Sequence, residues 1–175
     1  DIRKGDTLRD PQHKEHGHLM TFSRCIMNPP FSLKGWGKED CDNDGYGRFP
    51  YGTPPKDAGD LAFLQHMIAS LNDDGMAGIV MPHGVLFRGS SEKEIRKGIL
   101  EDDLLEAVVG LPSGLFYGTG IPACLLIINK NKPAERKNKV LFINGELEFQ
   151  EGKNQNTLRQ IDIDKIVATF DDYQD

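Results

Sequence analysis

The 175-residue sequence contains few cysteines, no long apolar segment and no recognisable targeting signal. Its three cysteines lie far apart and lack the paired spacing of a zinc site, which argues against a metal centre and a disulfide framework. No apolar run approaches the roughly 20 residues that a membrane-spanning helix needs, and the first residues do not resemble a signal peptide. These absences favour a cytoplasmic domain with reduced thiols, no metal and no membrane contact.

Positive charge is also scarce. The chain has 21 Lys and Arg residues against 27 Asp and Glu residues, for a formal net charge of −6. A protein that holds DNA by itself usually has an excess of basic residues. If this chain acts on DNA, a partner must therefore supply much of the contact with phosphate.

Apolar residues follow strand and helix patterns in alternation along the chain. A strand is predicted over 19–27, a helix with one apolar face over 57–71 and a buried strand over 77–82. A long Gly- and Pro-rich loop separates the first two, over 32–56. Further strands are expected at 105–111, 124–128 and 140–143, with helices after the capping-box pattern of Ser91–Glu94 and over 161–170. The alternation predicts an α/β fold: a mostly parallel sheet with an antiparallel edge strand and helices on both faces.

One tetrapeptide, Asn28-Pro29-Pro30-Phe31, has a composition that suits a chemical step. It follows the predicted strand 19–27, and in open α/β sheets ligands bind at the carboxyl ends of strands. Each proline holds the residue before it in extended backbone and lacks an N–H. The Asn28 side-chain oxygen and the Pro29 carbonyl oxygen thus become two preset acceptors, which would bind both hydrogens of an amino group.

Two such acceptors would favour a pyramidal nitrogen and localise the lone pair that an aromatic amine shares with its ring. A methyl sulfonium donor could then be attacked in line, through positioning and electrostatic preorganisation without a tuned general base. Phe31 would stack on the base, which must be flipped out of a duplex to reach such a pocket. For the tetrapeptide alone, the alternative is a Pro-Pro turn after a strand with an incidental Asn.

Other notable residues have an ordinary structural interpretation beside a functional one. The three histidines within 13–18 favour a solvated loop over a metal site. His83 favours a turn over a place in the cleft, and the basic stretch 130–139 favours a solvated turn over contact with phosphate. For the aromatics of 49–55, contact with the target strand and packing on the domain stay equally open.

Several segments beyond the tetrapeptide resemble one enzyme family. They are Ile2–Leu8, Gly78–Arg88, Leu111–Phe116, Ile127–Lys130 and Glu151–Asn156. Together they make essentially the whole chain similar to the modification subunit of type I restriction–modification systems. The resemblance implies a Rossmann-like methyltransferase fold, S-adenosylmethionine as cofactor, and methyl transfer to N6 of adenine in DNA.

The same resemblance implies roles for individual residues and partners. Asn28, Pro29, Pro30 and Phe31 would form the adenine pocket, and Asp6 would accept a hydrogen bond from the adenine amine of the cofactor. The implied partners are DNA, a specificity subunit that selects the sequence and a restriction (nuclease) subunit, in a bacterial or archaeal cytoplasm.

The chain departs from the family pattern in one respect. The family's glycine-rich cofactor loop and its ribose-binding acidic residue lie upstream of Asp6, and neither is present in this sequence. We therefore expect residues 1–145 to form a partial catalytic domain and 146–175 a C-terminal extension with a helix. We also expect the strand before Asn28 to have an unpaired edge, and the chain alone to bind S-adenosylmethionine weakly or not at all.

Two other functions stay open from the sequence. A similar Asn-Pro-Pro-aromatic loop serves methyltransferases that act on protein glutamine or on RNA, although these usually carry Tyr at the fourth position. The other is a non-catalytic role, as a fragment that docks a partner subunit.

Overall fold

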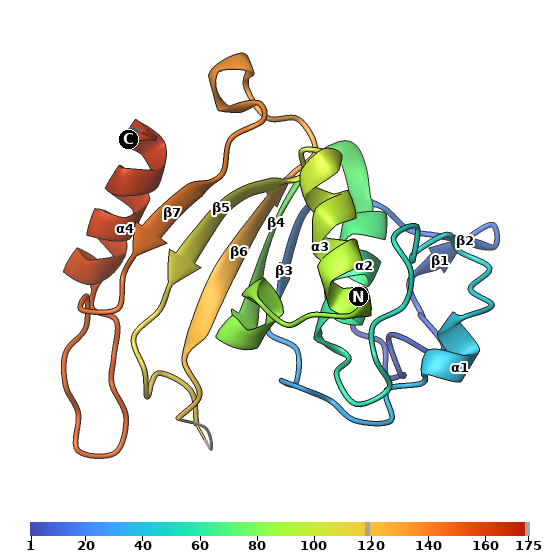
Figure 1. The fold of residues 1–175 in the computed structure, drawn as a ribbon, viewed down its shortest axis with the longest axis horizontal. Helices are drawn as coiled ribbons and strands as arrows, with labels where there is room; N and C mark the ends of the chain where they lie inside the picture. Colours follow the sequence, from blue (N-terminus) through green and yellow to red (C-terminus); the bar gives the residue numbers. More distant parts are fainter. Residues whose placement is uncertain (118–119, 174–175) are drawn as a thin grey trace.

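A five-stranded sheet forms the centre of the computed structural model, which describes residues 1–117 and 120–173 (Figure 1). The strand order is β3-β4-β6-β5-β7. The strands of this sheet are β3 (Phe22–Met27), β4 (Leu71–Pro82), β5 (Leu105–Gly110), β6 (Ala123–Asn129) and β7 (Leu141–Asn144). A separate two-stranded sheet pairs β1 (Lys14–Glu15) with β2 (His18–Leu19). The predicted α/β class and the predicted strand positions are thus confirmed.

Strand direction agrees with the prediction except in one place. β3 runs parallel to β4, and β5 runs parallel to β7. β6 is antiparallel to both β4 and β5, so the antiparallel strand lies inside the sheet and not at its edge as predicted. The sequence of β6 itself explains this position, because apolar side chains occupy both of its faces. An interior strand of a sheet with helices on both sides has both of its faces covered. The parallel strand β7 then takes the edge position beyond β5.

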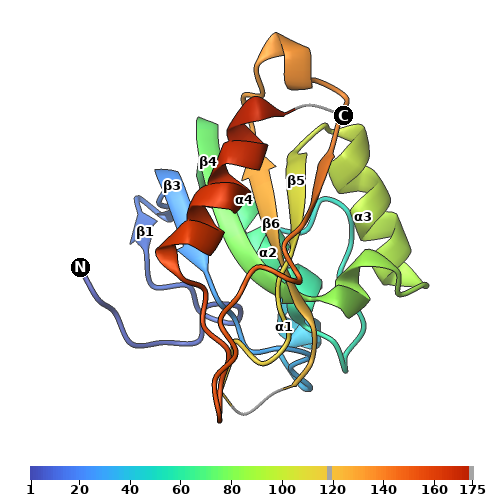
Figure 2. The ribbon, with the colours of Figure 1, turned by 90° about the vertical axis from the view of Figure 1, so that its left-hand side faces the viewer.

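Helices cover both faces of the sheet, as expected (Figure 2). The helices α2 (Asp60–Ala69) and α3 (Ser91–Glu101) pack on one face, where the main core includes Leu64, Ile79 and Ile95. The helix α4 (Gln160–Asp172) packs on the other face, against a smaller cluster around Val109 and Ile143. The remaining helical elements are α1 (Lys38–Cys41), η1 (His83–Leu86) and η2 (Ala134–Arg136).

Two predicted element ends are wrong. The helix predicted over 57–71 spans Asp60–Ala69, and the strand predicted over 77–82 already begins at Leu71, where β4 pairs with Phe22 through an irregular register. The capping box predicted at Ser91–Glu94 does not form, because α3 begins after Ser90 and has no side-chain cap. The backbone N–H of Arg159 instead bonds Asp162 at the start of α4. The local sequence pattern thus predicted a capping box at α3, whereas the folded chain forms one at α4.

The edge strand β3 leaves part of one sheet face uncovered. Its outward-facing Ile26 is 94% exposed. A groove of about 600 Å³ runs over this face, lined by residues of β3, β4 and β6 and bounded by Phe170 of α4. The predicted unpaired edge is therefore confirmed in the described chain. Among the described residues, no helix is both long enough and apolar enough to cross a bilayer.

Candidate active site

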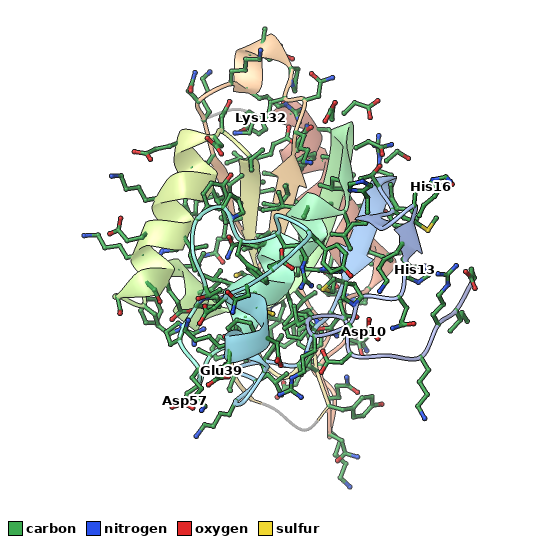
Figure 3. The ribbon with its side chains drawn as sticks, turned by 90° about the vertical axis from the view of Figure 1, so that its right-hand side faces the viewer. Asp10, His13, His16, Glu39, Asp57 and Lys132 are labelled. Atoms are coloured by element: carbon green, nitrogen blue, oxygen red, sulfur yellow. The ribbon has the colours of Figure 1, made fainter. Side chains whose placement is uncertain are left out.

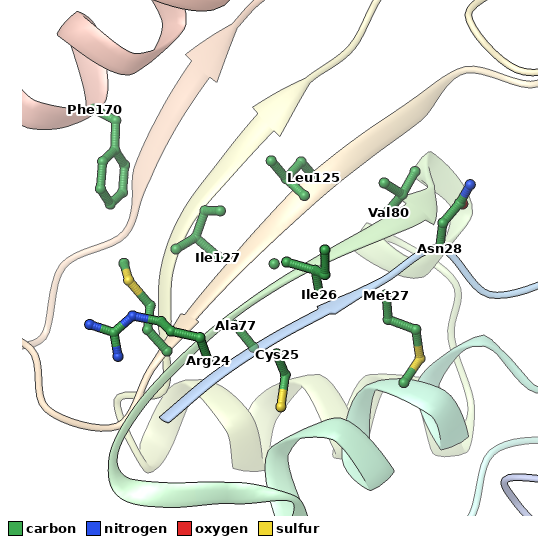
Figure 4. Close-up of a pocket in the computed structure, with 12 residues that line it drawn as sticks. Arg24, Cys25, Ile26, Met27, Asn28, Ala77, Val80, Leu125, Ile127 and Phe170 are labelled. Atoms are coloured by element: carbon green, nitrogen blue, oxygen red, sulfur yellow. The ribbon is translucent and has the colours of Figure 1, made fainter. Parts of the chain in front are cut away.

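The tetrapeptide Asn28–Phe31 leaves the sheet at the carboxyl end of β3. Figure 4 shows Asn28 at this end of the strand, beyond Ile26 and Met27, which point to opposite faces of the sheet. Asn28 is exposed and Pro29 is buried. The strand thus presents the amide of Asn28 to solvent, while the buried ring of Pro29 anchors the turn that follows.

Phe31 meets a second aromatic ring from a distant part of the chain. Its ring lies edge-on to that of Phe116, with centroids 6.1 Å apart and planes at 74°. Phe116 belongs to the connection between β5 and β6, so the carboxyl ends of two parallel strands contribute one aromatic ring each. Sequence reasoning assigned no site role to Phe116, although it quoted the motif that contains this residue.

A short hairpin from the C-terminal part holds the connection that carries Phe116. The hairpin closes through a bridge between Gln150 and Thr157. Asn156 Nδ2 donates to the Ser113 carbonyl oxygen at 2.9 Å, and the Asn156 N–H donates to the Gly114 carbonyl oxygen at 2.9 Å. Gly114 has a φ of +68°, which an L side chain rarely adopts. The hairpin therefore holds in place the backbone of the connection that carries Phe116.

The chain after Phe31 is fastened to the start of α2. The Ser32 N–H donates to Asp60 Oδ1 at 2.7 Å. Two backbone bonds continue the contact: the Gly59 N–H donates to the Leu33 oxygen, and the Gly35 N–H donates to the Lys56 oxygen, each at 3.1 Å. We call residues 32–35 with 56–60 the loop brace. It holds the tetrapeptide from its C-terminal side.

Asp6 organises a turn near the N-terminus. Its Oδ1 accepts the N–H groups of Leu8 and Arg9, each at 3.0 Å. Its Oδ2 lies 3.8 Å from Arg9 Nη1, and the side chain is 49% exposed. One carboxylate oxygen is thus committed to the turn, and the other lies near Arg9 on a half-exposed side chain.

Two arginines tie the turn of Asp6 to the long loop after the tetrapeptide. Arg9 Nη2 donates to the Gly35 carbonyl oxygen at 2.7 Å. Arg48, only 3% exposed, donates to the Leu8 carbonyl oxygen at 2.8 Å and lies 3.3 Å from His66 Nδ1. Burial, with the nearby Arg48 charge, lowers the pKa of His66 from 6.5 to about 4. The turn of Asp6 and the long loop that follows the tetrapeptide are therefore in direct contact.

The sequence matches a family model over the whole chain. Residues 1–175 match the family described as N-6 DNA methylase. The chain belongs to the N-6 DNA methylase family.

Known relatives of this N-6 DNA methylase chain include the type I restriction enzyme MjaVII methylase subunit of Methanocaldococcus jannaschii. The two are 40% identical, over 100% of this chain and 31% of the relative. The HindI methylase subunit of Haemophilus influenzae is 37% identical, over 97% of this chain and 37% of the relative. The chain thus spans about a third of the length of these relatives.

A solved structure gives the same result. The type I restriction-modification system methyltransferase subunit from Streptococcus thermophilus is 38% identical and superimposes with a TM-score of 0.87, over 97% of this chain and 36% of that chain. The family resemblance and the methyltransferase fold expected from the sequence are both confirmed.

Several other residues of the N-6 DNA methylase chain have structural contacts. Figure 3 shows His13 and His16 near the small β1–β2 sheet, and His13 packs edge-on to Phe22. Over residues 1–117 and 120–173 no cluster of three or more His, Cys, Asp or Glu suits a metal. His83 Nε2 lies 2.9 Å from the Ala123 oxygen. His13 and His83 therefore make structural contacts within the chain.

The two aromatics of the loop 49–55 pack on their own domain. Phe49 lies 6.4 Å from Trp36 between ring centroids. Tyr51 bonds Asp102 through its hydroxyl and lies against Gly98 of α3. Of the two alternatives left open by the sequence, packing is the one observed.

The basic stretch 130–139 is mostly exposed, as the predicted solvated turn requires, but two of its cations are engaged in the fold. Lys132 is 4% exposed and bonds Asp103 and the Lys139 oxygen. Arg136 pairs with Glu106 at 3.1 Å. The solvated turn is therefore confirmed for most of the stretch, whereas Lys132 and Arg136 are held in ion pairs and are not free for phosphate. Figure 3 shows Lys132 at the opposite end of the molecule from Glu39 and Asp57.

Proposed function

We propose that this chain forms the target-base part of a DNA adenine-N6 methyltransferase, as the modification subunit of a type I restriction–modification system. One observation carries the proposal: Asn28, followed by Pro29 and Pro30, projects from the carboxyl end of β3, and Phe31 next along the chain meets the ring of Phe116. Family membership supports the same reaction. The names of the relatives, each a methylase subunit of a type I enzyme, support the type I assembly.

The reaction follows from what these residues can bind. The Asn28 amide oxygen and the Pro29 carbonyl oxygen accept the two hydrogens of the adenine amino group, which localises the nitrogen lone pair. S-adenosylmethionine supplies an electrophilic methyl group on sulfur. The N–C bond would form as the S–C bond breaks, with S-adenosylhomocysteine as the leaving group, and the nitrogen would then lose one proton to solvent. Phe31 holds the flipped base by stacking, a contact of roughly 1–3 kcal/mol.

The proposed cofactor contact within this chain is Asp6. Its Oδ2 would accept a hydrogen bond from the adenine amine of S-adenosylmethionine, while Oδ1 keeps the turn intact. DNA, a specificity subunit and a restriction subunit are the proposed partners. The net charge of −6 supports this division, because a partner with basic residues would supply the contacts with phosphate.

Replacement of Asn28 tests the proposal. In the full-length enzyme with its partner subunits, Asn28→Ala should lower methyl transfer by about 10²- to 10³-fold, the range for loss of one preorganised polar contact. The assay follows tritium from labelled S-adenosylmethionine into plasmid DNA that lacks adenine methylation. Nucleoside analysis then identifies the methylated base.

Asn144 offers a matched control, because it is an exposed asparagine that also ends a strand of the sheet. Asn144→Ala should retain the wild-type rate. Undiminished transfer by Asn28→Ala would contradict the catalytic role. Label found in release-factor glutamine or in RNA, with none in adenine of DNA, would reject the proposed substrate.

A further inference from the structure

One bond of the loop brace comes from a side chain, so a substitution can remove it without changing the backbone bonds of the brace. Asp60 is fully buried, at 0% exposure, at the first position of α2. Its Oδ1 accepts the Ser32 N–H at 2.7 Å, directly after Phe31. Ser32 has a φ of +50°, a left-handed conformation that costs a non-glycine residue free energy. The bond from Asp60 therefore stabilises a strained turn next to the tetrapeptide.

The other oxygen of Asp60 is held from a third segment. Arg88 Nη2 donates to Asp60 Oδ2 at 2.7 Å. Arg88 also lies 3.5 Å from Glu92 of α3, which is 3% exposed. A buried carboxylate without a partner would be costly, and Arg88 supplies that partner. The Asp60 carboxylate thus cannot rotate away from Ser32 without losing its ion pair.

This arrangement joins the carboxyl ends of two neighbouring strands. Ser32 follows β3, and Arg88 follows β4 by way of η1. Asp60 is the only residue of the brace that bonds both segments through its side chain in the described part of the chain. Through these two bonds Asp60 restrains the turn that orients Phe31 and the Pro29 carbonyl.

We propose that Asp60 is a positioning residue that holds the target-base loop in its reactive geometry through the Ser32 N–H, an inference that rests on the proposed function. Asp60 does not touch the base in this role. It limits the movement of two acceptors that must stay aligned with an amino group, and a misplacement of about 1 Å can cost on the order of 10²-fold in rate.

A simpler interpretation has to be separated from this one. An aspartate at the first turn of a helix also stabilises that helix through its dipole, and a buried ion pair contributes to folding. Glu106 provides a matched control, because it is also 0% exposed and paired with an arginine, Arg136, at 3.1 Å. It lies near the amino end of β5, at the far end of the sheet from Asn28.

The test compares Asp60→Ala, Asp60→Asn and Glu106→Gln in the full-length enzyme with its partners. The substrates are tritiated S-adenosylmethionine and plasmid DNA without adenine methylation. Asp60→Ala should lower kcat by about 10- to 100-fold while KM for DNA and for cofactor change less than about threefold. Asp60→Asn should lose less, because its amide oxygen can still accept the Ser32 N–H. Glu106→Gln should keep kcat close to wild type.

Hydrogen exchange provides a readout that does not depend on any reaction. Backbone amides of residues 31–33 should exchange faster in Asp60→Ala and not in Glu106→Gln. The inference is overturned if Asp60→Ala keeps wild-type kcat, if Glu106→Gln loses as much, or if exchange at 31–33 is unchanged. Equal losses for Asp60→Asn and Asp60→Ala would also overturn it, since the Arg88 charge pair would then be the cause.

The same experiment separates the two proposals. If the wild-type assembly transfers no methyl group to adenine, the proposed function fails, whereas exchange at 31–33 still reports whether Asp60 holds the loop. If the wild type methylates adenine and Asp60→Ala does so equally well, the proposed function stands and the positioning role is rejected.

Discussion

His66 connects the core to the loop through a contact that requires its neutral form. Arg48 lies 3.3 Å from His66 Nδ1 and is itself a donor, so this nitrogen must act as the acceptor. Burial lowers the pKa of His66 from 6.5 to about 4. Between about pH 6.5 and about pH 4, His66 binds more protons in the unfolded chain than in the folded chain, so acidification favours unfolding.

The pH dependence of stability tests this residue. The free energy of unfolding should fall by about 2 kcal/mol between about pH 7 and about pH 5 through His66 alone. Urea denaturation of wild-type chain and of His66→Gln at both pH values measures it. The variant should show a smaller loss on acidification, by about that amount. An equal pH dependence in both proteins would contradict the neutral, buried state of His66.

The residues of the site differ in how visible they are in the sequence. Asn28, Pro29 and Pro30 are adjacent, and their backbone restrictions are local, so a preset pair of acceptors was predictable. Phe116 and Asp60 act on the same loop from 85 and 28 residues beyond Phe31 and Ser32, respectively. Nothing in their local sequence distinguishes a ring or a carboxylate that touches the loop from one that packs in the core.

Elements show the same division between local and long-range information. Strand positions followed from apolar runs, because burial of those runs needs no knowledge of their neighbours. The place of β6 between β4 and β5 depends on pairing across the sheet, and the sequence prediction put an antiparallel strand at the edge. The end of α2 was misplaced because Leu71 continues the helical apolar spacing but packs as the first residue of β4.

The hairpin that ends at Thr157 makes a testable element. Asn156→Asp should loosen the connection that carries Phe116, because a carboxylate would face the Ser113 carbonyl oxygen where an amide N–H donates now. Loss of one such bond costs about 1 kcal/mol, or about fivefold in affinity. KM for DNA in the full-length enzyme should rise by about that factor.

Asn154 in the same hairpin is exposed and provides the control. Asn154→Asp adds the same charge without facing the Ser113 carbonyl, and KM for DNA should stay at the wild-type value. A similar rise in both variants would assign the effect to charge repulsion from DNA and not to the hairpin contact.

At the scale of the whole molecule, the exposed groove and the free edge of β3 lie together. An edge strand with an exposed apolar face is a template for pairing with another chain. We expect the 175-residue chain to self-associate with rising concentration, and Ile26→Lys to reduce this association. Sedimentation velocity over a concentration series measures both.

Leu147 provides the matched control for this prediction. It is 85% exposed but lies outside the strands, so Leu147→Lys adds the same charge away from the edge. Association should persist in that variant. A wild-type chain that stays monomeric over the whole series would contradict the expectation, as would an equal effect of the two substitutions.

Arg9 bonds Gly35 and pairs with Asp40, so the turn of Asp6 and the loop after Phe31 are held together as one rigid unit. Thermodynamic linkage then requires reciprocity: if a ligand at Asp6 restrains that unit and so aids base binding, DNA must raise the affinity for that ligand by the same factor. In the full-length enzyme, S-adenosylmethionine should bind more tightly with DNA present. Arg9→Met should bring the two dissociation constants, measured with and without DNA, closer together.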